Sequence, residues 1–192
     1  MGEPDPRAPA TERAWHLLAL GVVALAALVL FAMGRTAWCK CGSPVPWSFQ
    51  VASMHTSQHL VDAYTLTHVL HGVVLCGALS LLVRGPRLRL GIAVALESAW
   101  ELLENTSWII ERYRAGTISL DYYGDSVANS LSDVAACALG YAAARRLGLR
   151  GSLALFVAVE GLLLLSIRDS LVLNVIMLVH PVPAIRAWQM GQ

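Results

Sequence analysis

Long apolar stretches that hold acidic residues and histidines constrain this chain more than any other feature. The run Trp15–Met33 carries no formal charge over a length that can cross a bilayer. Hydrophobic residues make up 56% of the sequence and charged residues 14%, and the mean hydropathy is +0.58. An ionisable side chain inside a bilayer costs at least about 2.5–3.5 kcal/mol, so each one is a candidate functional residue. The pattern predicts an integral membrane protein with an internal polar site.

The apolar stretches also predict the fold class. We expect an all-α, polytopic membrane protein with about five transmembrane helices and a short C-terminal helix. The expected spans are about 15–33, 64–83, 90–110, 124–144 and 151–167. All of them belong to a single membrane domain over residues 15–192.

Two flanking segments are not expected to span. Residues 1–14 are rich in proline and polar residues, which predicts a disordered cytoplasmic tail. The apolar stretch 170–179 is too short to cross a bilayer directly. It is therefore expected to be a re-entrant helix, an interfacial helix or a bent continuation of the fifth span.

The arginines predict the orientation. The connections RGPRLR (84–89) and RRLGLR (145–150) hold three arginines each, and short loops rich in arginine favour the cytoplasm. Both connections fall on the same side, which agrees with alternating spans. The N-terminus is then cytoplasmic and the C-terminus extracytoplasmic, and the polar loops 34–63 and 111–123 face outward.

The four cysteines fall into two groups. Cys76 and Cys137 lie inside apolar helices, where a cysteine is most simply a small hydrophobic residue. Cys39 and Cys41 form a C-x-C motif that could be an oxidised pair, which an extracytoplasmic position permits, or a metal-binding pair. Zinc is the less favoured interpretation, because no second C-x-C or histidine motif adjoins the pair in sequence.

Helical spacing places the polar residues on common faces. Three sets share a face: His68 with His71, Glu97 with Glu101 and Glu104, and Asp125 with Asn129 and Asp133. At about 1.5 Å of rise per residue, the three sets reach a common layer roughly 6–13 Å below the outer ends of their helices. We therefore predict a polar chamber in the outer half of the membrane, with Glu97 and Glu160 as its deeper floor.

Two kinds of chemistry fit such a chamber. Histidines with carboxylates are usual ligands of Zn²⁺, Mn²⁺ or Fe²⁺, so His68 and His71, with Glu101 and Asp133, are the predicted metal ligands. Without a metal, packed carboxylates raise one another's pKa and a carboxylate–histidine pair can act as acid and base. The candidate catalytic residues are Glu101, Glu104, Asp125, Asn129 and Asp133.

Four further residues are candidates for substrate binding. Purely structural roles are the alternative interpretation for these and for the candidate catalytic residues. The candidate substrate-binding residues are Arg168, which would form the rim of the chamber, His59, Asp62 and Asn105. Polar residues such as Glu104 and Asn105 can instead hydrogen-bond between membrane helices, and Asp125 can cap a helix.

Several motifs resemble a known family. They are AYTLTHVLHG (63–72), ESAWELLENTSWIIERYR (97–114), YYGDSVANSLSD (122–133), IRDSLVLNVIMLVHP (167–181) and AIRAWQ (184–189). Together they resemble a bacterial family of uncharacterised multi-pass inner-membrane proteins, known by a UPF label and a domain of unknown function. The resemblance implies the bacterial inner membrane and a topology, but no activity. A more distant outline, with Asp125, Asn129 and Gly140, is similar to VanZ-like membrane proteins.

The sequence leaves three classes of function open. The favoured one is a membrane-embedded hydrolase or transferase that acts on a lipid or envelope substrate at the outer leaflet. The alternatives are a small proton-coupled transporter and a non-catalytic membrane assembly factor. The sequence has no H-E-x-x-H, G-x-S-x-G or P-loop motif, and no basic stripe that would indicate a nucleic-acid partner. The reaction, the metal and the oligomeric state are not specified by these motifs.

Overall fold

The protein is helical, with a single isolated bridge between Trp47 and Val61 in the described part. A computed structural model describes residues 8–51 and 53–191. These residues form the helices α1 (Ala8–Ala32), α2 (Thr65–Leu82), α3 (Pro86–Glu104), α4 (Ser107–Gly116), α5 (Val127–Ile167), α6 (Leu171–Val179) and α7 (Pro183–Gln189). The all-α prediction is confirmed.

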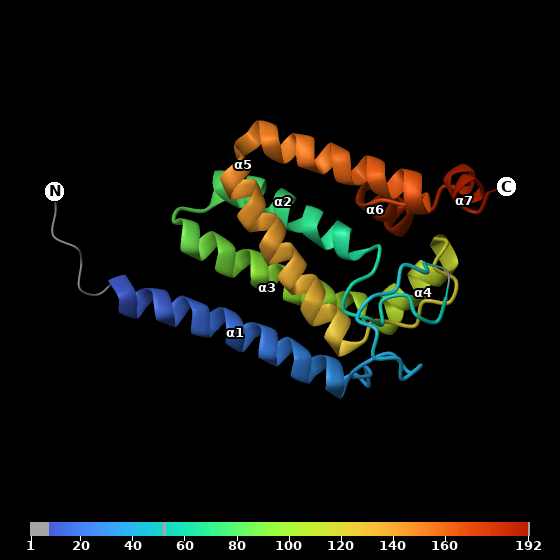
Figure 1. The fold of residues 1–192 in the computed structure, drawn as a ribbon, viewed down its shortest axis with the longest axis horizontal. Helices are drawn as coiled ribbons and strands as arrows, with labels where there is room; N and C mark the ends of the chain where they lie inside the picture. The colour runs from blue at the N-terminus through green and yellow to red at the C-terminus, as the bar shows by residue number, and fades with distance from the viewer. Residues whose placement is uncertain (1–7, 52, 192) are drawn as a thin grey trace.

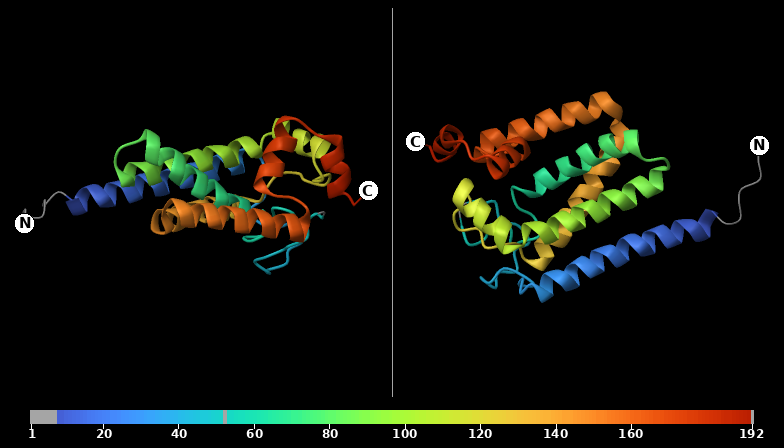
Figure 2. Two further views of the ribbon diagram at one scale, coloured as in Figure 1. Left: turned by 90° about the horizontal axis from the view of Figure 1, so that it is seen from above. Right: turned by 180° about the vertical axis from the view of Figure 1, so that it is seen from behind.

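The long helices lie side by side and run along the longest axis of the molecule (Figure 1). They are α1, α2, α3 and the two arms of α5, which turns back on itself at Gly148, where φ is 65° and ψ is −176°. The connection between α2 and α3 and the bend of α5 lie at one end. The loops, α4, α6 and α7 gather at the other end (Figure 2).

Membrane-spanning character is less extensive than expected. Within the described residues, α2 and α5 are long and apolar enough to cross a membrane. The prediction of about five spans is not supported by this test. Among the residues of α1 whose side chains are described, Leu17–Ala32 is apolar but shorter than a full span, and α3 carries arginines and glutamates along its length. Helix α5 alone covers the two spans expected at 124–144 and 151–167.

Helix boundaries differ from the expected ones for local reasons. The helix expected at 90–110 ends at Glu104, because the Thr106 side chain accepts a hydrogen bond from the Ile109 N–H and starts α4. Helix α4 therefore occupies the first half of the loop expected at 111–123. Helix α1 begins at Ala8, so residues 8–14 of the expected tail are helical, while 1–7 lie outside the described residues.

The short C-terminal helix is a separate element. Arg168 adopts the left-handed conformation, with φ of 53°, and ends α5. Ser170 then caps α6 by accepting a hydrogen bond from the Leu173 N–H at 3.3 Å. Helix α6 is thus not a bent continuation of the preceding helix. Helix α7, which the sequence did not predict, follows at Pro183.

The α2–α5 contact brings two backbones together. A Cβ atom on Gly72 would lie 2.0 Å from the carbonyl oxygen of Cys137, and one on Gly140 would lie 2.0 Å from that of Val69. Only glycine permits this approach, which membrane helices commonly achieve through small residues. Because His68 precedes Gly72 by one turn, the same crossing sets its position against α5.

We predict that Gly72→Ala destabilises the fold by about 1–3 kcal/mol, because the added methyl group pushes α2 away from α5. The matched control is Gly77→Ala on the same helix, where a Cβ meets no atom within 4 Å. That change should leave stability equal or raise it by up to about 1 kcal/mol. Thermal unfolding of the detergent-purified variants, followed by circular dichroism, measures both. Equal melting temperatures would contradict the close crossing.

Candidate functional site

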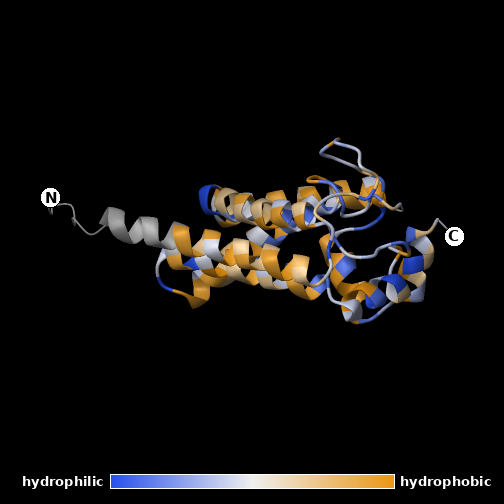
Figure 3. Cartoon of the chain, turned by 90° about the horizontal axis from the view of Figure 1, so that it is seen from below, coloured by the Kyte–Doolittle hydropathy of each residue, from blue (hydrophilic) through white to orange (hydrophobic). Residues whose placement is uncertain are grey.

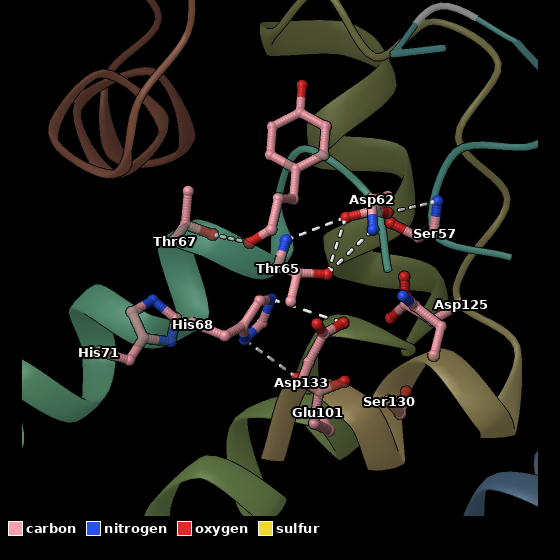
Figure 4. Close-up of polar contacts among 12 residues, drawn as sticks. Ser57, Asp62, Thr65, Thr67, His68, His71, Glu101, Asp125, Ser130 and Asp133 are labelled. Carbon is pink, nitrogen blue, oxygen red and sulfur yellow. Dashed lines mark hydrogen bonds and ion pairs between the residues drawn. The ribbon is translucent and has the colours of Figure 1, made fainter. Parts of the chain in front are cut away.

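His68 of α2 lies at the centre of a group of buried carboxylates. Its Nδ1 atom is 2.7 Å from Oε1 of Glu97 and 3.4 Å from Oε1 of Glu101, both on α3. Its Nε2 atom lies 3.9 Å from Oδ2 of Asp133 on α5. Helices α3 and α5 therefore direct carboxylates at one imidazole of α2, and Figure 4 shows His68 facing Glu101 and Asp133. The shared faces predicted from helical spacing do meet.

Glu97 binds both histidines. Its Oε1 atom is 2.7 Å from Nδ1 of His68 and 2.9 Å from Nδ1 of His71. A carboxylate that holds one ring nitrogen of a histidine fixes the tautomer and leaves the other nitrogen free as a ligand or base. Glu97 was expected only as the floor of the chamber. The sequence did place Glu97 on the same helical face as Glu101 and Glu104, at i, i+4 and i+7, and this spacing could have predicted its contact with the histidines.

Several buried oxygens in this group lack hydrogen bonds. Within the described residues, neither carboxylate oxygen of Glu101 has a hydrogen-bond partner, nor does Oδ1 of Asp133. Glu101 is 1% exposed and Asp133 is 3% exposed. Buried polar atoms are nearly always hydrogen-bonded, and buried charges are paired or coordinate metals. These oxygens therefore indicate a site built for a further ligand or proton.

A cavity of about 60 Å³, enough for a few water molecules, adjoins the histidines. His68, His71 and Glu104 line one side of it, and Asp125 lines another. Helix α6 and the loop that precedes α2 also contribute to its wall. Polar groups from sequentially distant segments thus line one cavity.

Asp125 lies at the outer end of the cavity, in the loop before α5. Its Oδ1 accepts a hydrogen bond from the Tyr122 hydroxyl at 2.9 Å, and its Oδ2 accepts one from the Asn105 amide at 2.6 Å. Burial raises the pKa of Asp125 to about 6, although these two hydrogen bonds act in the opposite direction. Asn105 also accepts the Asp125 N–H at 2.8 Å, so it positions this carboxylate.

Asp62 and Asn129, both predicted site residues, hold the surrounding backbone. Asp62 accepts hydrogen bonds from the N–H groups of Ser57 at 3.0 Å and Thr65 at 2.9 Å, as Figure 4 shows. Burial raises the pKa of Asp62, and the Thr65 hydrogen bond partly offsets this. The Asn129 amide donates to the carbonyl of His59 at 2.8 Å. Neither side chain lines the cavity.

Arg168 ends α5, and Glu160 lies within α5, about two helical turns before that end. The Arg168 guanidinium donates to the carbonyl of Trp188 at 3.3 Å, which ties α7 to the end of α5. Glu160 accepts the N–H of Leu171 at 2.9 Å and caps α6. Glu160 therefore has a local partner and does not form the floor of the chamber, where it was expected.

His59 lies apart from the other candidates. Its ring belongs to a second group with Cys39, Cys41 and His55, whose ligand atoms all lie within 4.8 Å of one another. The chamber and this second group are linked through the backbone of His59. The sequence showed both cysteines but not the histidines beside them, because folding of the loop brings these residues together.

Comparison with known proteins defines the family. The family model described as "Protein of unknown function (DUF2585)" matches residues 30–191. The chain belongs to this family. The "UPF0314 protein" of Paracoccus denitrificans (strain Pd 1222) is 51% identical over 172 residues, which cover 88% of each chain. The UPF0314 protein of Rhizobium meliloti (strain 1021) is 47% identical over 179 residues, covering 92% of this chain and 91% of its own.

The predicted membership of an uncharacterised bacterial family is confirmed, whereas the likeness to VanZ-like proteins stays a prediction. No solved structure matches the chain. The family description states no reaction, so the chemistry must be argued from the buried residues of this DUF2585 member.

We predict that Asp125 makes the stability of this protein fall as pH rises from about 4 to about 7. A pKa raised in the folded state means that the folded protein holds the proton more tightly than the unfolded chain. The stabilisation is complete below the unfolded pKa of 3.8 and is lost as pH rises through about 6. The raised pKa corresponds to about 3 kcal/mol.

Unfolding of Asp125→Asn, which stays neutral, should depend less on pH than unfolding of the wild type. The variant should gain stability relative to the wild type at pH 7 and lose that advantage at pH 4. The exposed Asp121, changed to Asn, is the matched control and should follow the wild-type profile. Parallel profiles for all three proteins would show that Asp125 does not carry this proton.

Proposed function

We propose that this DUF2585 protein is an integral membrane hydrolase or transferase whose His–carboxylate site opens to the extracytoplasmic side. The proposed substrate is a lipid or another component of the cell envelope. The observation that carries the proposal is the set of buried carboxylate oxygens of Glu101 and Asp133 that lie beside His68 without a hydrogen bond. Two independent sets of observations support the proposal: the apolar outer surfaces of the helices support a place in the membrane, and the His–carboxylate contacts support the chemistry.

The outer surfaces of the helices support membrane placement. Leu81 of α2 is 86% exposed, and Leu139 and Leu165 of α5 are 69% and 89% exposed. Figure 3 shows apolar residues along the helices and polar residues concentrated in the loops. Soluble monomers rarely expose apolar patches beyond a few hundred Å², whereas lipid covers such surfaces. Alternation of α1, α2, α3 and the two arms of α5 along one axis is consistent with five crossings.

The orientation proposed for these crossings follows from the arginines. Residues 84–89 and 145–150 lie at the same end of the molecule, opposite the loops that enclose the cavity. Short arginine-rich connections favour the cytoplasm. The cavity then faces the extracytoplasmic side of a bacterial inner membrane, where a lipid headgroup can reach it.

The donor set supports a divalent metal at His68. The Nε2 atom of His68 and Oδ2 of Asp133 are 3.9 Å apart, too far for a hydrogen bond. Two ligand bonds of about 2.0–2.2 Å to one Zn²⁺ span this distance. His68 with Asp133 and Glu101 would hold the ion, while Glu97 orients His68 and His71. Zinc, manganese or iron at this position would supply an activated water molecule.

The remaining residues have roles that the cavity suggests. Glu104 lines the cavity and is placed to exchange a proton with a group bound there. Asp125, with its pKa of about 6, is mostly ionised at neutral pH and can accept a proton from a nucleophile in the cavity. Asn105 fixes the position of Asp125, and residues of α6 line another part of the cavity wall.

A proton pathway is the second candidate function, because Glu97 joins His68 and His71 through short hydrogen bonds. Carboxylates and histidines in series are parts of proton relays in transporters. Glu160, which would have extended such a relay, caps α6 instead. The enzyme is therefore the better supported of the two.

The proposed topology predicts opposite locations for the two ends of the chain. Green fluorescent protein fused to the N-terminus should fluoresce, since it folds in the cytoplasm, and alkaline phosphatase fused to the C-terminus should be active outside. The control is green fluorescent protein fused to the C-terminus instead, which should not fluoresce because that end is expected outside the cytoplasm. Fluorescence from both ends would contradict an odd number of crossings.

Metal analysis of the detergent-purified protein tests the chamber. We expect zinc, manganese or iron in the wild type, with its affinity reduced at least about tenfold in both His68→Ala and Glu101→Gln. The exposed His180, changed to Ala, is the matched control and should keep the wild-type metal content. If folded wild type and both chamber variants hold the same metal content, the chamber is not a metal site and the proton relay becomes the better function.

A further inference from the structure

The loop between α1 and α2 has little regular structure to hold it. None of its described residues, 33–51 and 53–64, is helical, and its strand pairing is the single bridge between Trp47 and Val61. The loop nevertheless brings together the side chains of Cys39, Cys41, His55 and His59. A cluster of two thiols and two imidazoles in a loop of this kind needs an explanation.

The distances fit a tetrahedral metal site. All four ligand atoms lie within 4.8 Å of one another, and Sγ of Cys39 is 3.5 Å from Nδ1 of His55. With Zn–S bonds of about 2.3 Å and Zn–N bonds of about 2.0–2.1 Å, two ligands of a tetrahedral zinc ion are about 3.6 Å apart. The observed separation is that of two ligands on one ion.

The order of the ligands in the chain also fits. The 13 residues 42–54 separate the second cysteine from the first histidine, and three residues separate the two histidines. Zinc sites of the two-cysteine, two-histidine type commonly place about 12–15 residues between the pairs and three to five between the histidines. The C-x-C pair is one residue shorter than the usual first half. A tight turn, with Gly42 at φ of 70° and its N–H bonded to the Cys39 carbonyl at 3.1 Å, accommodates this.

The ring of His59 is oriented as a ligand. Its Nδ1 atom lies 2.6 Å from the carbonyl oxygen of Val45, which can only accept, so Nδ1 carries the proton. The Nε2 atom then has a free lone pair in the neutral ring. It is buried and has no hydrogen-bond partner among the described residues, and His59 is 3% exposed. A backbone carbonyl that holds the far nitrogen is the usual partner of a metal-bound histidine.

The cysteines receive hydrogen bonds that stabilise thiolates. The backbone N–H of Cys41 points to Sγ of Cys39 at 3.4 Å, and that of Ser43 points to Sγ of Cys41 at 3.4 Å. Thiolate is the form that binds a metal.

We propose that Cys39, Cys41, His55 and His59 bind a structural Zn²⁺ ion that folds the α1–α2 loop over the chamber. Four protein ligands close the coordination sphere, which is typical of structural rather than catalytic zinc. The site is separate from the chamber and does not depend on a metal at His68.

The position of the ligands explains what the zinc stabilises. His55 and His59 flank Thr56 and Ser57, the loop residues that line the cavity. The Ser57 carbonyl accepts the N–H of Ser126 at 2.9 Å at the start of α5. Zinc binding would therefore fix the segment that forms the outer wall of the cavity, and its binding energy would add to the stability of the loop.

X-ray absorption at the zinc edge, together with elemental analysis, tests the proposal on the full-length protein purified in detergent under reducing conditions. We expect one sulfur-ligated zinc ion per chain, with sulfur scatterers at about 2.3 Å, whether or not the chamber also holds a metal. The sulfur-ligated zinc should persist in a His68→Ala, Glu101→Gln chamber variant and disappear in a Cys39→Ser, Cys41→Ser variant. Cys76→Ser, which changes a cysteine outside the cluster, is the matched control and should keep the zinc.

Counting the reactive thiols of the folded wild type tests zinc binding by Cys39 and Cys41 even if the double cysteine variant fails to fold. Zinc should protect two thiols from a thiol reagent until a chelator removes it. Reaction of Cys39 and Cys41 at the rate of free thiols would overturn the proposal. So would a Cys39–Cys41 disulfide detected by mass spectrometry in protein from the native membrane, or bound zinc with no sulfur ligand. Failure of this test leaves the chamber proposal unaffected, because the chamber has no sulfur ligand.

Discussion

The backbone contact between α2 and α5 at Gly72 and Gly140 is the constraint on which the rest of the structure depends. Because neither glycine has a side chain, the backbones of α2 and α5 touch at the crossing. The side chains one helical turn away from the glycines are therefore the ones that contact each other across the two helices. One turn toward the loops, His68 reaches Asp133 across the two helices, and α3 adds its glutamates from the side. A larger residue at the crossing would separate these groups before any of them was itself changed.

The polar residues around the chamber divide into satisfied and unsatisfied groups. Asp125 accepts hydrogen bonds from the side chains of Tyr122 and Asn105, and Asp62 accepts hydrogen bonds from the backbone N–H groups of Ser57 and Thr65. Glu101 has no such partner, although it is equally buried. Polar networks that only fix a fold tend to be complete, since each missing hydrogen bond costs about 1–3 kcal/mol. The contrast agrees with the role proposed for Glu101 in the chamber and with a structural role for Asp62.

Much of the site, but less of the fold, could be predicted from the sequence. Residues at i, i+3 and i+7 share a face wherever a helix forms, so the meeting of His68, Glu101 and Asp133 followed from spacing. The break after Glu104 depended on one threonine cap, and the pairing of Glu160 with α6 depended on a turn that spacing does not describe. The Cys–His cluster left only a spacing signal, with 13 residues between Cys41 and His55 and three between His55 and His59. Its four members approach one another only when a long irregular loop closes, and helical periodicity carries no information about such closure.

His59 belongs to two neighbourhoods at once, since its ring faces the cysteines while its carbonyl accepts the amide of Asn129 on α5. A displacement of His59 therefore changes both the Cys–His cluster and the contact with α5. The backbone of His59 is a physical link between the Cys–His cluster and the start of α5, so one residue sets both the geometry of the cluster and the packing of the loop against α5.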